Sequence, residues 1–582
     1  MKKYLRIVSI FLVVCFLTCS LTSCAVTDIK QQLKQLLIRS GFLVELQEDG
    51  TTALTGTPAV STDEAATESG ETTPDQLVSN LKYSLTDEDV SEYYVILKAC
   101  EAAFLNGEST EAELKEIEDR FVDAYYHIVT QSQIAYLWYC MDTGNAEYTE
   151  NYLFSSEASA DAYDAYMQLC KRMDVCESPW RDRFFEGWSA EELEEMRGFS
   201  EELTELGKAN DRLTVQYRQL SNEDFYDGAA DFYVQLVKNN NRIAELMGYE
   251  NFWLYAYGEE YGRDYGKSEI QQMRQYVQTY LVSLCEEARI AFRTRYEMLS
   301  PPDRVFVAEL LEHADYDDFS VDYVGGYLSS FGEEQADDMS SMFLADHSFF
   351  ANSQNAHEGA YTTYLYSLER PVCYFGPGYQ GMDTVIHELG HYYSFMINGD
   401  DPIHMDLAEV QSQGNEWLFW AYMDTVLAED VADAVYAYCL YDSLGTVIIG
   451  AMIDEFEQLC YERAITSSEE ADAVMAEVKS RYGGDAWLSQ NLTDPDLYWR
   501  CVTVEQSVYY VSYSVSMLAA MQIYSVANSQ SYDAAMELYL SLVDPVSPSL
   551  MACLTAAGLK TPMDEGLYLE LDFLNSELDF SI

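Results

Sequence analysis

The sequence predicts a mainly α-helical protein with one small hairpin or sheet in its second half. From Asp75 to about Met298, apolar residues recur at intervals of three and four positions, and strong helix formers fill the gaps. Between Gly359 and Gly381 the pattern changes to β-branched and aromatic residues bounded by Gly and Pro, which is typical of short strands. Helical periodicity then returns and continues to about Gly558.

The N-terminus has the pattern of an export signal. A basic start is followed by an apolar run from Ile7 to Leu17, which is too short to span a bilayer. The run leads to Leu21-Thr22-Ser23-Cys24, the residue types that lipoprotein signal peptidases accept before a cysteine that becomes lipidated. We therefore expect a signal peptide at 1–23 and a lipid anchor on Cys24. An ordinary secretory signal with an incidental cysteine is the alternative.

The composition divides the rest of the chain. From Glu48 to Asp75 there is no aromatic residue, Lys or Arg, so we expect a flexible linker at 24–78. Some five hundred residues follow, which is enough for one large core or two lobes. We expect an N-terminal helical region at 79–200 and a catalytic region at 201–570. The anchor would hold this body outside the cytoplasm, on the cell membrane.

Charge and cysteine content narrow the class of protein. The formal net charge is −66, which disfavours nucleic acid and anionic lipid as partners and leaves the anchor as the expected membrane contact. Ten cysteines lie beyond Cys24 at irregular spacings, with no CxxC pair. This disfavours a cysteine-built metal site and a dense disulfide framework, although one or two disulfides remain open.

One motif carries recognisable chemistry. His387-Glu388-Leu389-Gly390-His391 fits H-E-x-x-H, with Asp383 before it as a candidate N-cap and Asn398-Gly399 after it as a stop. Residues at i and i+4 project from one helical face, so His387 and His391 can reach a single metal ion. Glu388 then lies beside that ion and can act as general base.

A catalytic zinc site usually has three protein ligands, so a third is expected downstream. A metzincin would need a His six residues after His391, but Ile397 stands there. His404 is possible, although it lies between Pro402 and the next helix with no partner motif. Glu409 fits better, because Asp406 can cap a helix that begins near Leu407 and carries this carboxylate to the ion. Glu416 shares the same helical face and could support a ligand.

These strings resemble a known family. Val385–His391 and Leu407–Glu416 are similar to the two metal-binding helices of the thimet oligopeptidase and oligoendopeptidase F family. In that family the first Glu of the second string is the third zinc ligand, which agrees with Glu409. Gly359-Ala360-Tyr361 and Ile243–Phe252 also resemble family segments, so the likeness spans about Arg242 to Tyr513.

The resemblance implies a two-lobed helical body around a deep cleft that admits short peptides and rejects folded proteins. Peptide hydrolysis also needs an oxyanion donor besides the metal, and Val508–Tyr513 is the candidate segment, in which Tyr509 and Tyr513 share a helical face, as do Tyr510 and Tyr513. Tyr513 is our first choice, followed by Tyr509 and Tyr510; packing in the core is the alternative. A family His expected near Cys501–Glu505 is missing, since no His follows His404.

The sequence thus predicts an endopeptidase with one Zn²⁺, held by His387, His391 and Glu409, that cleaves unstructured oligopeptides. The alternative is a catalytically impaired, peptide-binding surface lipoprotein that keeps the same fold. The missing His favours the alternative, whereas an intact Glu388 counts against it. Gly376-Pro377-Gly378 allows two interpretations, a close approach for substrate or a simple turn.

Overall fold

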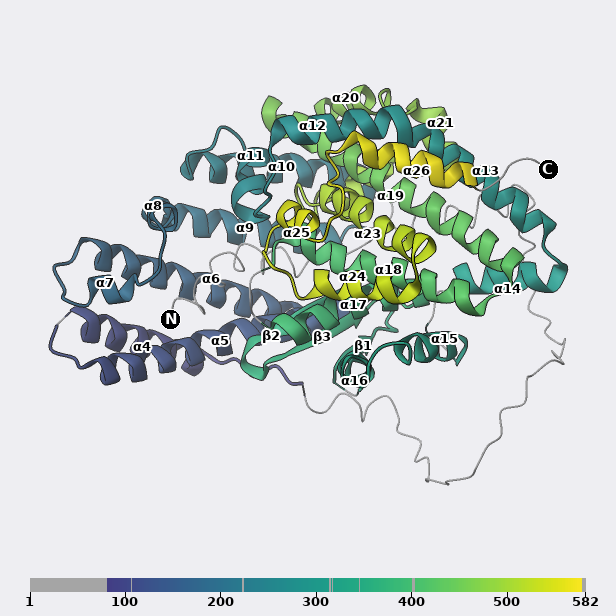
Figure 1. Ribbon diagram of the computed structural model, residues 1–582. Coiled ribbons are helices and arrows are strands. Elements are labelled where there is room, and N and C mark those ends of the chain that lie inside the picture. Colours follow the sequence, from purple (N-terminus) through teal and green to yellow (C-terminus); the bar gives the residue numbers. More distant parts are fainter. Residues whose placement is uncertain are drawn as a thin grey trace.

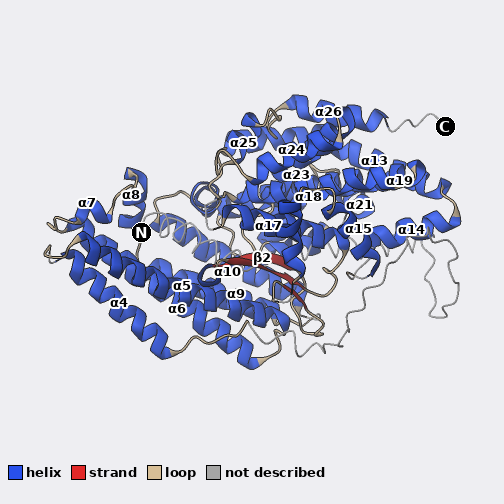
Figure 2. Ribbon diagram, turned by 60° about the horizontal axis from the view of Figure 1, so that its bottom comes forward, coloured by secondary structure: helices blue, strands red, loops and turns tan. Residues whose placement is uncertain are grey.

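The computed structural model describes residues 81–105, 107–221, 224–312, 316, 318–344, 346–399, 403–492 and 494–577. The expected signal peptide, Cys24 and the linker lie outside these residues. Within them the chain is mainly helical, as the sequence predicts, with a single small sheet near the middle of the molecule (Figures 1 and 2).

The N-terminal helices form a lobe at one side of the molecule (Figure 1). Thr110 and Glu113 form a capping box that starts the second of these helices, and Asn145 caps the third. The lobe has its own hydrophobic core, centred on Tyr93, Phe121 and Tyr166. Its helices are α4 (Asp87–Leu105), α5 (Glu111–Met141), α6 (Ala146–Val175), α7 (Arg181–Phe184) and α8 (Ala190–Gly198).

A second, larger core fills the rest of the molecule. The C-terminal half of α5, from Ile134 to Cys140, belongs to this larger core, so one continuous helix joins the two lobes. The helices from the lobe to the sheet are α9 (Glu201–Arg218), α10 (Phe225–Leu246), α11 (Phe252–Tyr255), η1 (Ala256–Glu260), α12 (Lys267–Tyr276), η2 (Val277–Leu281), α13 (Val282–Met298), α14 (Pro301–Glu312), α15 (Asp318–Leu328), α16 (Glu333–Ser340) and η3 (Ser341–Phe343).

The helices after the sheet supply the centre of the larger core. Among the described residues, the helix Glu429–Arg463 is long and apolar enough to cross a membrane, but 83% of its most apolar stretch is buried inside the protein, as in a core helix. These helices are α17 (Met382–Asn398), α18 (Met405–Val426), α19 (Glu429–Arg463), α20 (Ser468–Lys479), α21 (Gly484–Asn491), α22 (Pro495–Val502), α23 (Val511–Ser529), α24 (Tyr532–Val543), α25 (Leu550–Ala556) and α26 (Glu565–Glu577). Helical structure therefore continues beyond Gly558.

The sheet contains three strands in the order β1-β3-β2. Strands β2 (Ala360–Leu365) and β3 (Arg370–Phe375) form the antiparallel hairpin that the sequence predicts, joined by the short helix η4 (Tyr366–Leu368). Strand β1 (Ser348–Phe350) pairs in parallel with β3 and was not predicted. Strand β2 is thus an outer strand of the sheet, and it packs against α17.

Two predicted helix caps are wrong. Gly381 precedes α17, so Asp383 lies in the first turn rather than at the cap. His404 precedes α18, and Asp406 is buried inside its first turn. Asp406 instead accepts hydrogen bonds from Tyr265 (2.7 Å) and Ser512 (2.6 Å) and pairs with Arg263. These partners lie more than a hundred residues away, so the local pattern could not reveal them.

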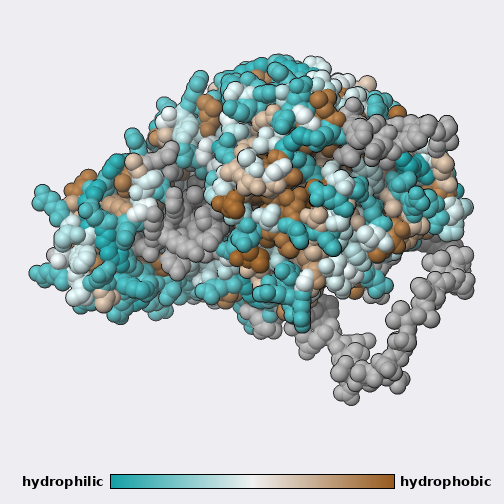
Figure 3. Space-filling model, viewed as in Figure 1, coloured by the Kyte–Doolittle hydropathy of each residue, from teal (hydrophilic) through white to brown (hydrophobic). Residues whose placement is uncertain are grey.

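The surface is largely hydrophilic and the described cysteines are unpaired, as the acidic composition and the irregular cysteine spacing indicate. Hydrophilic side chains dominate the outline of the face in Figure 3, and hydrophobic side chains gather near its centre. The ten cysteines beyond Cys24 are all free, and all but Cys176 and Cys501 are buried. No disulfide therefore stabilises the part of the chain that the structure describes.

Candidate metal centre

The site is built where α17 crosses α18. Gly390, inside the H-E-x-x-H motif, makes this crossing close: a Cβ atom there would lie 2.6 Å from the carbonyl oxygen of Gln411 and 2.7 Å from Ser412 Cα. Asn415 of α18 then donates a hydrogen bond of 2.7 Å to the carbonyl of Ile386. The two helices are therefore held at a fixed separation, with Val385, Ile386 and Leu389 buried on the core side of α17.

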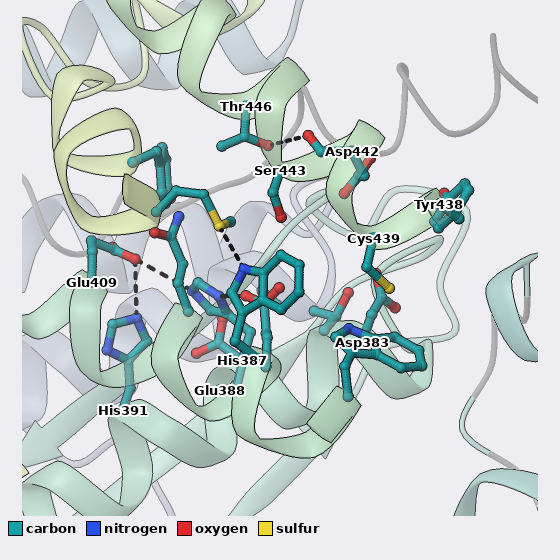
Figure 4. Close-up of a pocket in the computed structure, with 18 of the residues that line it drawn as sticks. Asp383, His387, Glu388, His391, Glu409, Tyr438, Cys439, Asp442, Ser443 and Thr446 are labelled. Carbon is teal, nitrogen blue, oxygen red and sulfur yellow. Dashed lines mark hydrogen bonds and ion pairs between the residues drawn. The ribbon is translucent and has the colours of Figure 1, made fainter. Parts of the chain in front are cut away.

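Three ligand-type side chains converge across this crossing (Figure 4). One donor atom from each of His387, His391 and Glu409 lies within 4.8 Å of the other two. Glu409 Oε2 is 3.5 Å from His387 Nε2 and 3.7 Å from His391 Nε2. Ligands about 2.0–2.1 Å from a tetrahedral ion are separated by roughly 3.3–3.4 Å, so a small adjustment would seat a metal ion among them. The donor set therefore fits a metal ion.

Glu416 fixes the orientation of one imidazole. Its Oε1 lies 2.6 Å from His387 Nδ1, so the proton on Nδ1 points at the carboxylate and Nε2 faces Glu409. Burial lowers the pKa of His387, but the Glu416 carboxylate, together with Glu409 and Glu388, raises that pKa to about 9. This is the carboxylate–imidazole arrangement that orients metal-binding histidines.

Glu409 is fully buried yet charged. Burial alone would raise its pKa, but His391 and His387, together with the hydroxyl of Tyr509, lower it to about 2. The hydroxyl of Ser412 donates a further hydrogen bond of 3.1 Å to Glu409 Oε2. Burying a charged carboxylate away from water costs free energy unless such partners surround it. The partners of Glu409 therefore allow it to present a negatively charged oxygen inside the protein.

Glu388 lies in the same cavity, on the side of α17 that faces β2. Its Oε2 accepts a hydrogen bond of 2.7 Å from the hydroxyl of Thr362 in β2. Burial raises the pKa of Glu388, against the lowering effect of His387, His391 and this hydrogen bond. No local pattern indicates a role for Thr362, because its contact with Glu388 requires β2 to pack on α17.

The three candidate tyrosines occupy different positions. Tyr513 lines the cavity, and burial raises its pKa well above the usual value, so its hydroxyl stays protonated. Tyr510 also lines the cavity, at the foot of α23. Tyr509 is fully buried, is not part of the cavity wall, and donates its hydroxyl to Glu409 Oε1. The expectation that Tyr509 serves as an oxyanion donor therefore disagrees with where its hydroxyl points.

The structure also shows the position of His404 and of the segment where the family resemblance implies a further His. His404 precedes α18, its backbone N–H donates to the carbonyl of Pro548, and it is not among the three converging ligands. Where the family resemblance implies a His, Glu505 forms a buried ion pair with Arg218 (2.6 Å). The guanidinium of Arg218 also lies over the ring of Tyr136. The segment Cys501–Glu505 therefore contributes a buried ion pair.

The cavity beside the ligands is small and mixed in character, with a volume of about 120 Å³. Walls come from β2, α14, α17, α18, α19, α22 and α23, and Figure 4 shows residues of α19 facing the ligand cluster. Besides the ligands and tyrosines, its lining includes Leu310, Leu311, Ala360, Tyr361, Asp383, Thr384, Gln413, Trp417, Trp420, Tyr438, Cys439, Asp442, Ser443, Thr446, Tyr498 and Met517.

Gly376 is a turn residue. A Cβ atom at Gly376 would lie 2.1 Å from the carbonyl oxygen of His357, and its N–H donates to Gly359 at 2.7 Å. The space beside it is thus filled by the chain itself. Of the two interpretations of Gly376-Pro377-Gly378, the structure favours the turn into α17.

The chain thus combines a mainly helical body with a small sheet that packs beside the H-E-x-x-H helix, and this architecture is found in solved structures. A Bacillus anthracis str. Ames protein assigned as an oligoendopeptidase F matches with a TM-score of 0.66 and 18% identity, over 86% of this chain and 97% of its own. PZ peptidase A, solved with an inhibitor, gives 0.69 and 17%, over 86% and 99%. Oligoendopeptidase-F from Enterococcus faecium gives 0.54 and 16%, over 85% and 98%.

No protein-family model and no curated protein matches the sequence. The structural likeness covers nearly the whole of each of these three proteins at low identity. The chain therefore has the oligoendopeptidase F fold, as the resemblance of Val385–His391 and Leu407–Glu416 implied.

Proposed function

We propose that this chain is a zinc-dependent endopeptidase that hydrolyses peptide bonds in short, unstructured oligopeptides. The convergence of His387, His391 and Glu409 on one point, with Glu388 in the same cavity, carries the proposal. The fold supports it, because the similar structures include proteins named as oligoendopeptidases.

Zinc is the metal that this donor set favours. Two imidazoles and one carboxylate are typical of catalytic zinc sites, which keep a further position for water or substrate. When bound, zinc would supply Lewis-acid activation of a water molecule and of the peptide carbonyl. His387, held by Glu416 through Nδ1, would present Nε2 to the ion.

Glu388 is the proposed general base. The Oε2 atom of Glu388 accepts a hydrogen bond from the hydroxyl of Thr362. The other oxygen, Oε1, can then take a proton from the attacking water. The raised pKa brings this carboxylate closer to the pH at which it works, so it can both accept that proton and return it to the departing amine.

Tyr513 is the proposed donor to the developing oxyanion. It lines the cavity with Glu388, and its ring packs edge-on against Tyr509 and Tyr510 at 5.2 and 5.4 Å. Its raised pKa keeps the hydroxyl protonated, as a hydrogen-bond donor must be.

The outer strand β2 offers a place for the substrate backbone. Ala360 and Tyr361 line the cavity, and an extended peptide added alongside β2 would pass the metal ligands. Gln133 of α5 already bonds the carbonyl of Tyr364, so the part of β2 proposed to pair with the peptide is its first half.

We further propose that the protein acts outside the cytoplasm, anchored through a lipid on Cys24. The basic and apolar start of the chain and the Leu21–Cys24 string support this location. Metabolic labelling with a fatty acid should mark the protein and fail to mark a Cys24→Ala variant.

Peptide digestion tests the enzymatic proposal. The purified protein with Zn²⁺ should cleave a mixture of short peptides, and both chelation and Glu388→Gln should reduce turnover about 10²–10⁴-fold. Glu369→Gln, at an exposed position on the hairpin, is the matched control and should leave turnover unchanged. Turnover that survives Glu388→Gln would refute the proposal, and peptide binding without any cleavage would favour the impaired lipoprotein instead.

A further inference from the structure

The two oxygens of Glu409 have different partners. Oε2 faces both imidazoles and accepts a hydrogen bond from the hydroxyl of Ser412. Oε1 accepts the hydroxyl of Tyr509. Among the ion pairs of the described residues, Glu409 has no Lys or Arg partner, so the phenol is the group that engages this second oxygen. One oxygen is therefore turned toward the metal position and the other is turned away.

Tyr509 is held in place by its surroundings. Its ring is fully buried and lies against Tyr261 at 5.8 Å and Tyr513 at 5.2 Å. The hydroxyl of Tyr261 donates in turn to the carbonyl of Ser507 at 2.8 Å. The phenol of Tyr509 thus has little freedom to follow a substrate or to turn into the cavity.

The residue before Tyr509 has a strained backbone. Val508 has φ +62°, a left-handed conformation that a β-branched residue rarely adopts. The N–H of Val508 donates to the buried carboxylate of Glu457 and lies 2.9 Å from both of its oxygens. The carbonyl of Val508 accepts a hydrogen bond of 3.0 Å from the guanidinium of Arg263. Such a conformation persists only where neighbouring groups determine it, and it directs the next side chain toward Glu409.

We propose that Tyr509 is a positioning residue that acts through Glu409. By engaging Oε1, its hydroxyl fixes the carboxylate so that only Oε2 reaches the metal, and this leaves coordination space for water and substrate. The inference rests on the proposed function, because it takes the three converging side chains as a metal site.

The alternative role, direct contact with substrate, does not fit the geometry. Tyr513 and Tyr510 line the cavity whereas Tyr509 does not, and the Tyr509 hydroxyl is already engaged by the carboxylate. Loss of the Tyr509 hydroxyl should therefore weaken metal binding, and it should slow peptide hydrolysis only because less metal is bound.

Metal affinity provides the test. The purified, metal-stripped protein is titrated with Zn²⁺ against a competing chelator, as wild type, Tyr509→Phe and Tyr539→Phe. Tyr539 is the matched control, because its buried hydroxyl also donates to α18, at the carbonyl of Gln411 (3.1 Å), but not to a ligand. We expect Tyr509→Phe to weaken Zn²⁺ binding about 10–100-fold, and Tyr539→Phe to change it less than twofold.

Three outcomes are distinguishable. Equal Zn²⁺ affinity in the two variants would overturn the role of Tyr509, as would a lower kcat in Tyr509→Phe with unchanged Zn²⁺ affinity. Failure of the wild-type protein to bind Zn²⁺ would refute the proposed metal site itself. X-ray absorption of the zinc-loaded proteins adds a second readout, in which Tyr509→Phe should gain a metal–oxygen contact as Glu409 turns both oxygens to the ion. Thermal unfolding without metal, measured for both variants, checks that each remains folded.

Discussion

At the scale of single residues, Thr362 is the contact that most directly tunes the proposed base. Its hydroxyl stabilises the charged form of Glu388 and so opposes the effect of burial. In Thr362→Val, which keeps the shape but loses the donor, the pKa of Glu388 should rise further. Since a base acts only when unprotonated, the acid limb of the kcat/KM profile should move to higher pH, with little change near the optimum.

The measurement is a pH–rate profile on one peptide substrate. Thr363→Val is a suitable control, because its hydroxyl accepts from Gln133 instead and lies on the same strand. An acid limb that stays in place in Thr362→Val, or that moves equally in Thr363→Val, would contradict the assigned role of Glu388.

A second residue-scale prediction concerns the proton on His387. In the metal-free protein burial lowers the pKa of His387, but the carboxylates of Glu416, Glu409 and Glu388 raise it to about 9, so at pH 7 both ring nitrogens are protonated. Metal binding must then displace the Nε2 proton. Calorimetry in buffers of different ionisation enthalpy should find at least one proton released per Zn²⁺ at pH 7, and less release as the pH rises through about 9.

Glu416→Gln should change both quantities. Without the carboxylate the pKa of His387 falls, so fewer protons are released at pH 7. Zn²⁺ affinity should also fall about 10–100-fold, because the imidazole loses its orienting partner. Equal proton release from the wild type and the variant would show that Glu416 does not control this histidine.

These residues differ in how far the sequence predicted them. The i, i+4 spacing of His387 and His391 fixes their common face, so a local pattern is sufficient to pair them. To predict Glu409 as a ligand, a second helix had to be expected beside the first. The supporting role of Glu416 was then predictable from its position on that second helix. Tyr509 could not be assigned, because the direction of its hydroxyl depends on the left-handed Val508 and on Glu457, fifty-one residues away.

At the scale of elements, the crossing of α17 and α18 sets the geometry of the site. In Gly390→Ala the new Cβ would press on the backbone of Gln411 and Ser412. Because backbone cannot move aside like a flexible side chain, the helices must separate, at a cost of about 1–3 kcal/mol in unfolding free energy. Zn²⁺ affinity should fall as well, since the ligands come from both helices.

Gly207→Ala is the matched control. Gly207 lies inside α9, and a Cβ there would meet nothing within 4 Å. The same substitution should stabilise the protein by about 0.5–1 kcal/mol and leave Zn²⁺ binding unchanged. Denaturant unfolding and metal titration of both variants provide the check, and a Gly390→Ala protein as stable as the wild type would contradict the tight crossing.

Elements also differ in how well local sequence specifies them. The hairpin β2–β3 was predictable because its β-branched and aromatic residues are bounded by Gly and Pro. Strand β1 was not, since three residues in parallel pairing carry no pattern of their own. The start of α18 was misplaced because Asp406 serves a buried network with Arg263 and Tyr265, not a cap.

At the scale of the whole molecule, the two cores are joined by α5 and the hairpin. The first half of α5 packs in the N-terminal lobe, and its second half packs in the larger core. Tyr366, at the end of the hairpin, belongs to the core of the lobe, although β2 and β3 belong to the larger core. The three proposed metal ligands lie in α17 and α18, which belong to the larger core, so metal binding should stabilise that core.

Charge is the other property of the whole molecule. The chain has 33 basic and 99 acidic residues, so at most one carboxylate in three can be paired. Repulsion among the remainder opposes the compact state, and salt screens it: the Debye length falls from about 30 Å at 0.01 M to about 3 Å at 1 M. Added NaCl should therefore raise the Tm by a few degrees, and KCl should act equally because screening depends on ionic strength. A Tm that falls with either salt would mean that surface ion pairs outweigh repulsion in this acidic protein.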